Sequence, residues 1–159
     1  MTNLTPHFTL EEVTVTSHHE VSNLPTPAHR AALTATLLNV IEKVRAHYNR
    51  PVTINSGYRS PAVNKLVGGA SNSQHCNGEA IDFEVPGIAN MDVADWVAEH
   101  CEFDQIILEF YNPAEGPSSG WVHVSFKAGG GNRKQKLIAL KTGGKTVYKT
   151  IQDYNPSQH

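Results

Sequence analysis

Two histidines and an aspartate of this 159-residue chain have the types and spacing of a metal site. His75 precedes the turn dipeptide Asn77-Gly78, which reverses the chain and lets it return along a strand that holds Asp82. His123 lies in a second strand-like segment, WVHVSF, which can pair beside the first. Two imidazoles and one carboxylate suit Zn²⁺ with one position left for water, which makes hydroxide available at neutral pH. This chemistry is amide hydrolysis, although a histidine in a strand is more commonly a hydrogen-bonded core residue.

Several dispersed blocks of the sequence resemble one known family. The blocks GYRSPAVNKLVGG, SQHCNGEAIDF and GWVHVSF follow in this order and contain an S-x-H-x6-D motif with a later W-x-H. They resemble the zinc D-Ala-D-Ala carboxypeptidases of peptidase family M15. The opening HFTLEEVTVTSHHEVSNLPTP is similar to the small phage and prophage peptidases of that family, so the resemblance covers roughly residues 7–126. It implies that His75, Asp82 and His123 are the zinc ligands on a hedgehog/DD-peptidase fold.

The same resemblance implies that Arg59, in the YRSP segment, faces the substrate. Its guanidinium can clamp a peptide carboxylate or polarise the scissile carbonyl. The alternative is a structural arginine that anchors the loop before a helix beginning at Ser60-Pro61. Ser73 and Gln74 are further candidates for substrate binding, and Ser73 can instead hydrogen-bond a metal ligand or cap the turn.

Glu109 is the residue that we expect to move protons at this site. If QIILEFY and WVHVSF form a hairpin, pairing Tyr111 with Trp121 sets Glu109 opposite His123 on one face of the sheet. Its apolar strand neighbours would raise its pKa, as a general base or acid requires. The alternative is that Glu109 is an outward-facing strand residue with no role in catalysis. Many relatives place an acidic residue three positions before the last histidine, where this chain has Gly120.

These residues predict zinc-dependent hydrolysis of a peptide bond, and the resemblance implies that the bond lies in bacterial peptidoglycan. We expect a carboxypeptidase or an L-Ala-D-Glu endopeptidase that acts on stem peptides as a monomer, and the phage-type resemblance implies an endolysin. The alternative is a non-catalytic zinc-binding recognition module, because hedgehog signalling domains resemble this fold. Gly120 at the usual acidic position keeps that alternative open.

The composition excludes a membrane-spanning protein and a disulfide framework. Hydrophobic residues make up 39% of the chain and charged residues 18%, and no apolar run approaches the roughly 18 residues of a membrane span. The opening MTNLTPHFTLEE has no basic or apolar region of a signal peptide, so we expect synthesis in the cytoplasm and action on the cell wall after release at lysis. Cys76 and Cys101 are too few for a disulfide framework, and Cys76 is not expected to join His75 at one ion.

The charge is distributed unevenly along the chain. Residues 1–126 carry six Lys/Arg against 14 Asp/Glu, whereas residues 127–159 carry seven against Asp153 alone. This basic C-terminal hairpin segment could attract a polyanion, but it accompanies no recognised nucleic-acid-binding motif, so nucleic acid is not the expected partner. A solvated edge hairpin kept soluble by lysines is the simpler interpretation.

The pattern of helices and strands predicts a single α+β domain over residues 1–159. A helix should begin at Thr26-Pro27 and end before Pro51, and a second should cover about Met91–His100. Strands are expected at residues 51–58, 80–85, 105–110 and 121–126, with a hairpin around Gly143-Gly144. Without regular strand-helix alternation, we expect a largely antiparallel sheet flanked by helices, with the zinc site on the sheet face. Asp104 and Glu102 should decorate the entrance to the third strand, and Glu115 should be solvated.

Overall fold

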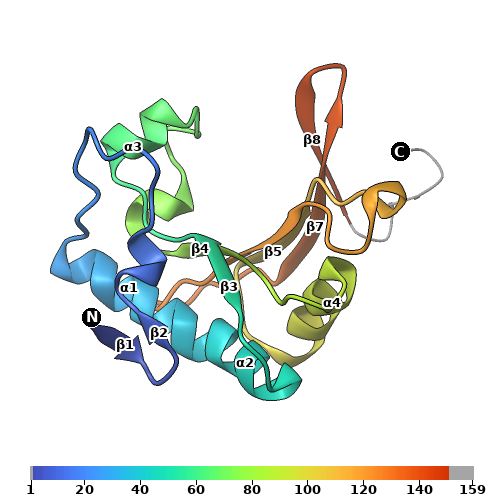
Figure 1. Cartoon of the computed structure of the whole chain (residues 1–159), viewed down its shortest axis with the longest axis horizontal. Helices are drawn as coiled ribbons and strands as arrows, with labels where there is room; N and C mark the ends of the chain where they lie inside the picture. The colour runs from blue at the N-terminus through green and yellow to red at the C-terminus, as the bar shows by residue number, and fades with distance from the viewer. Residues whose placement is uncertain (1, 151–159) are drawn as a thin grey trace.

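A computed structural model describes residues 2–150 of the chain (Figure 1). In chain order the elements are β1 (Asn3–Thr5), β2 (Phe8–Thr9), η1 (Glu12–Thr14), α1 (Pro27–Thr36), η2 (Leu37–Ile41), α2 (Glu42–Tyr48), β3 (Thr53–Ser56), α3 (Pro61–Leu66), η3 (Gln74–Asn77), β4 (Ala80–Glu84), α4 (Asn90–His100), β5 (Gln105–Glu109), η4 (Pro113–Glu115), β6 (Trp121–Ser125), β7 (Gln135–Thr142) and β8 (Lys145–Thr150). Every helix within this range is too short or too polar to cross a membrane.

The longest helical segment runs through α1, η2 and α2 and forms one wall of the core. It begins where the Thr26 side chain accepts a hydrogen bond from the His29 N–H, and it ends at Asn49, before Pro51. Both ends lie where the sequence predicts them. A π-helical turn at Leu37–Ile41 interrupts the regular α-helix. The residues that this segment buries repeat at helical spacing and are Leu33, Leu37, Val40, Ile41 and Val44.

A six-stranded sheet in the order β3-β4-β6-β5-β7-β8 carries the candidate site. Alternation along β4 and β6 turns Ile81, Phe83, Val122 and Val124 into the hydrophobic core, so the residues between them face the other side. Figure 1 shows α1, α2 and α4 below the sheet, with α3 and the β7–β8 hairpin rising on opposite sides above it. The upper face of the sheet is therefore flanked by two walls.

The predicted α+β class and largely antiparallel sheet are confirmed. Within the described residues, β5 and β7 form the one parallel pair of the sheet. The expected C-terminal hairpin is present as β7 and β8 around Gly143-Gly144, while residues 151–159 of the predicted basic segment lie outside the described residues.

The predicted register between β5 and β6 is wrong by two residues. Glu109, rather than Tyr111, pairs with Trp121, and Ile107 lies opposite His123. The reason is that β5 ends at Glu109: Phe110 adopts a left-handed φ of 55°, and its N–H donates to Ala139 of β7 instead of continuing the hairpin. Because side chains alternate with a period of two, Glu109 nevertheless shares a face with His123.

Candidate metal centre

Three buried side chains meet on the open face of the sheet. Asp82 of β4 and His123 of β6 are directly opposite each other in the antiparallel pair, and His75 approaches them from η3. His123 Nδ1 lies 2.8 Å and His75 Nε2 lies 3.3 Å from Asp82 Oδ1. The ligand atoms of all three residues lie within 4.8 Å of one another. The structure therefore brings together the three residues that the sequence predicted as metal ligands.

The backbone around η3 fixes the orientation of the His75 ring. Ser73 caps the turn, because its hydroxyl accepts a hydrogen bond from the His75 N–H at 3.2 Å. His75 Nδ1 lies 2.7 Å from the carbonyl oxygen of Gly57, which can only accept. Nδ1 therefore carries a proton, and Nε2 is the ring nitrogen that faces Asp82. A carbonyl behind the ring is a usual support for a histidine that binds a metal.

The electrostatics of the cluster favour an ionised Asp82. Burial opposes its charge, yet the two imidazoles outweigh burial and hold the pKa of Asp82 below its usual range. Burial also opposes the charge of His123, but the hydrogen bond and the negative charge of Asp82 raise the pKa of His123. One carboxylate and two imidazole nitrogens, all buried and convergent, are a donor set that fits a divalent metal ion such as zinc.

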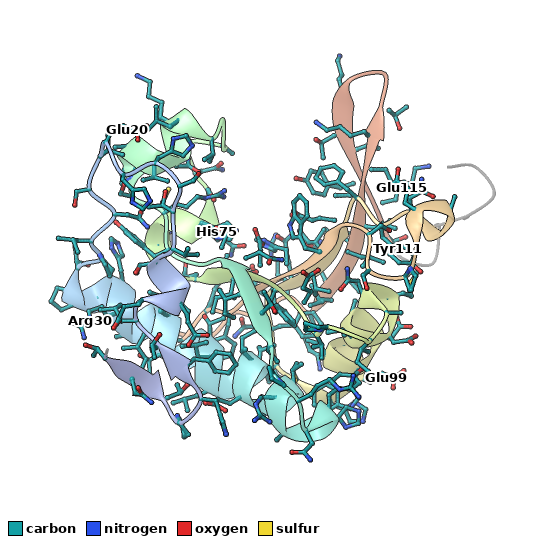
Figure 2. All side chains as sticks on the ribbon, viewed as in Figure 1. Glu20, Arg30, His75, Glu99, Tyr111 and Glu115 are labelled. Atoms are coloured by element: carbon teal, nitrogen blue, oxygen red, sulfur yellow. The ribbon has the colours of Figure 1, made fainter. Side chains whose placement is uncertain are left out.

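Glu109 lies beside this cluster. Its Oε1 is 3.9 Å from His123 Nδ1, and its side chain is largely buried. Burial, together with the negative charge of Asp82, raises the pKa of Glu109. Glu115, by contrast, is exposed on the outer loop, as expected (Figure 2).

Arg59 lines the same cavity from the segment before α3. Its side chain is half-buried, and its Nη2 donates to Ser73 Oγ at 3.4 Å. The Arg59 Nε is buried and has no hydrogen-bond partner among the described residues. Since a guanidinium has five N–H donors, several remain to bind an anion in the cavity.

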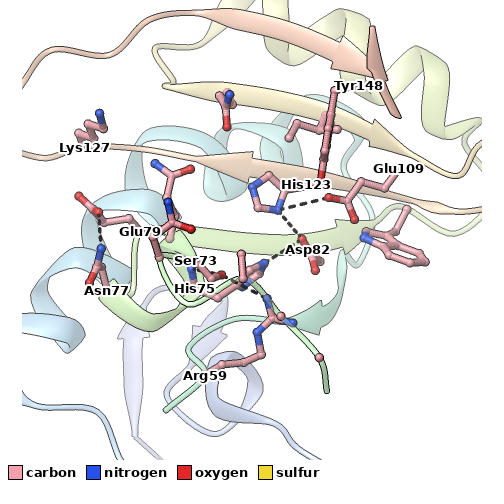
Figure 3. Close-up of a pocket in the computed structure, with 18 of the residues that line it drawn as sticks. Arg59, Ser73, His75, Asn77, Glu79, Asp82, Glu109, His123, Lys127 and Tyr148 are labelled. Carbon is pink, nitrogen blue, oxygen red and sulfur yellow. Dashed lines mark hydrogen bonds and ion pairs between the residues drawn. The ribbon is translucent and has the colours of Figure 1, made fainter. Parts of the chain in front are cut away.

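The cavity above the cluster has a volume of about 680 Å³, within the range of small-molecule and peptide sites. Figure 3 shows His123, Asp82 and Glu109 on neighbouring strands, with Arg59 on one side and Tyr148 on the other. Ser73 and Gln74, predicted as substrate contacts, also line it. Cys76 is half-buried and lies outside the three-residue cluster.

Asp104 lies directly before β5, as predicted, but it is not a surface residue there. It is fully buried and accepts two hydrogen bonds from the Arg133 guanidinium, at 2.9 Å to Nε and 2.8 Å to Nη2. The Gln74 amide donates to the same carboxylate at 3.1 Å. These hydrogen bonds, with Arg133 first, lower the pKa of Asp104 far below its usual range. The sequence shows a charged residue directly before an apolar strand, but it does not show that this residue binds the distant Arg133.

Two comparisons relate the chain to known proteins. Residues 6–125 match a family model described as Peptidase M15. A 34-residue stretch is 53% identical to the zinc D-Ala-D-Ala carboxypeptidase of Streptomyces albus G. That stretch covers 21% of this chain and 13% of the Streptomyces enzyme, so the similarity spans a small part of that relative.

Proposed function

Because this chain belongs to the Peptidase M15 family, we propose that it hydrolyses a peptide bond in bacterial peptidoglycan with a zinc ion held by His75, Asp82 and His123. The similarity to a zinc D-Ala-D-Ala carboxypeptidase supports both the metal and the substrate class. Zinc in such a site supplies a water of lowered pKa and polarises the carbonyl under attack.

Glu109 is the proton carrier in this proposal. From its place beside His123, its carboxylate accepts a proton from the attacking water and returns it to the nitrogen of the leaving group. Arg59 binds a carboxylate of the stem peptide or the oxygen of the scissile carbonyl with its free N–H groups. Ser73 holds the Arg59 guanidinium in place, and Gln74 lines the wall of the cavity.

The observation that carries this proposal is the position of Glu109 within 4 Å of a convergent His-Asp-His cluster. A recognition module needs no such carboxylate beside its metal. Gly120 does not argue against catalysis, because its φ is +67° and a Cβ there would collide with the Glu109 carbonyl oxygen. An acidic side chain does not fit at position 120, and Glu109 on the neighbouring strand takes over its role.

We also infer a biological setting from the sequence. The opening segment is similar to phage and prophage peptidases, which supports an endolysin that reaches the wall at lysis. The bond cleaved is then either the terminal D-Ala-D-Ala bond or an internal bond of the stem peptide.

Mass spectrometry of peptidoglycan fragments tests the proposal. Purified sacculi are incubated with zinc-loaded protein, with chelator-treated protein, and with the variants H123A and H19A. We expect new stem-peptide fragments from the zinc-loaded protein and from H19A, because His19 is exposed and does not line the cavity. Chelated protein and H123A should release none, and H123A should lose stoichiometric zinc. Zinc bound stoichiometrically by the unaltered chain without any cleavage would favour the recognition module instead.

A further inference from the structure

The β7–β8 hairpin contributes to the cavity although it lies outside the residues that match the family. The match ends at residue 125, whereas Tyr148 of β8 lines the same cavity as His75, Asp82 and His123. Lys127 and Arg133, which lie between β6 and β7, line it too. A part of the cavity wall is thus built by residues beyond the family match.

A row of directly paired residues across the sheet places Tyr148 relative to Glu109. Tyr148 of β8 is opposite Ala139 of β7, Ala139 is opposite Glu109 of β5, and Glu109 is opposite Trp121 of β6. Directly paired residues point to the same face of a sheet, so all four side chains face the cavity side. Ala139 has only a methyl group, which leaves room above it for the phenol ring.

The length of the tyrosine side chain brings its hydroxyl toward the centre of the site. Neighbouring strands are about 4.8 Å apart, so the backbone of Tyr148 is roughly 10 Å from that of Glu109. Figure 3 shows the ring extending from β8 toward His123 and Glu109. A peptide bond being cleaved at the metal would therefore have its flanking residue within reach of this ring.

Tyr148 is largely exposed although it lines the cavity. It is 57% exposed, whereas Ala139 beneath it is 1% exposed. Its ring offers an apolar face, and its hydroxyl offers one hydrogen-bond donor. The partial burial of the side chain and the charge of Glu109 both raise the pKa of Tyr148, so this donor stays protonated. This combination suits a peptide. The ring packs against a peptide side chain, and the hydroxyl donates a hydrogen bond to a peptide carbonyl.

We propose that the β7–β8 hairpin is one wall of the substrate site and that Tyr148 contacts a stem-peptide residue next to the scissile bond, across the cavity from Arg59. This inference rests on the proposed peptidase function. It assigns the basic C-terminal segment a role in substrate binding through Tyr148. The charges of the segment are not needed for this contact.

Steady-state kinetics of Y148A and Y148F on a purified stem peptide test this inference. The lost contact is one of binding, so Y148A should raise KM about tenfold with kcat changed less than about twofold. Y148F keeps the ring and loses the hydroxyl, and should raise KM about threefold. T146A is the matched control, because Thr146 is exposed on the same face of β8 but does not line the cavity. Zinc content and thermal unfolding of every variant should match those of the unaltered protein.

The outcomes separate this inference from the proposed function. If the unaltered protein is active and Y148A has the same KM, the role of Tyr148 is overturned and the peptidase function still stands. An equal rise of KM in Y148A and T146A would also overturn it, because that result indicates a general effect on the hairpin. Failure of the unaltered zinc-loaded protein to cleave any stem peptide would overturn both.

Discussion

Glu109 Oε1 lies 3.9 Å from His123 Nδ1, although the residue directly opposite Glu109 in the strand pair is Trp121. The two side chains are therefore diagonal neighbours on one face of the sheet, a distance that a glutamate can bridge. This placement depends on β5 ending at Glu109. Phe110, which has a left-handed φ of 55°, is no longer paired in the ladder, so Glu109 is the last paired residue of β5 and its carboxylate lies beside the cluster.

Replacing Glu109 by glutamine should strongly reduce catalysis and retain the metal. The amide has the shape of the carboxylate but cannot accept the proton, so kcat should fall by about 10²- to 10⁴-fold. Zinc content, measured by mass spectrometry of the metal, should stay at the level of the unaltered protein. E115Q is the control, because Glu115 is exposed in the loop. Undiminished hydrolysis by E109Q would remove Glu109 from the mechanism.

The central part of the site could be predicted from the sequence because it depends on short-range patterns. Alternation along β4 and β6 places Asp82 and His123 on one polar face, and the turn after His75 brings that residue back to them. The register error of two residues did not move Glu109 to the other face, since the side-chain period is also two.

The remainder of the site depends on pairings between distant segments. Tyr148 reaches the cavity because β7 pairs in parallel with β5, and no local pattern specifies that pairing. Asp104 accepts a hydrogen bond from Arg133, 29 residues further along the chain, and no local pattern specifies that contact either. Neither long-range partner has a signature in the sequence, whereas the fold class follows from short helices and strands that are mixed without regular alternation.

Substituting Arg59 should weaken substrate binding and leave the metal in place. R59A removes the donors that face the cavity, so kcat/KM for a stem peptide with a free carboxylate should fall about 10- to 100-fold. R59K should recover only part of this loss, because an ammonium cannot form the paired hydrogen bonds of a guanidinium. R30A, at an exposed position on α1, is the control in the same assay. Equal kinetics for R59A and R30A would contradict a substrate contact.

Gly120 should tolerate no side chain. Its φ is +67°, and an added Cβ would collide with the Glu109 carbonyl oxygen, so G120A should lower the free energy of unfolding by more than about 2 kcal/mol. Gly143 has a similar φ of +58° but no heavy atom within 4 Å of an added Cβ. G143A should therefore cost only about 1 kcal/mol, the penalty of the backbone conformation. Urea denaturation of both variants measures the difference. Equal losses of unfolding free energy would show that the Glu109 carbonyl oxygen does not restrict the side chain at position 120.

The buried Asp104 carboxylate should make the stability of the protein depend on acid pH. Its folded pKa lies below the unfolded value of about 3.9, so its contribution is present above pH 4 and is lost as the pH falls toward the folded pKa. D104N removes the charge that binds Arg133 and should lower the free energy of unfolding by about 2 kcal/mol at pH 7. The difference between the two proteins should narrow below about pH 4.

A surface aspartate provides the comparison for Asp104. Asp95 forms an ion pair with Lys136 at 2.7 Å, but its side chain is 44% exposed, so D95N should cost less than about 1 kcal/mol at pH 7. Denaturation of the unaltered protein, D104N and D95N at pH 7 and pH 3 measures both effects. A loss for D104N that is the same at both pH values would mean that its ionised form does not stabilise the fold. The large loss would then come from packing around position 104.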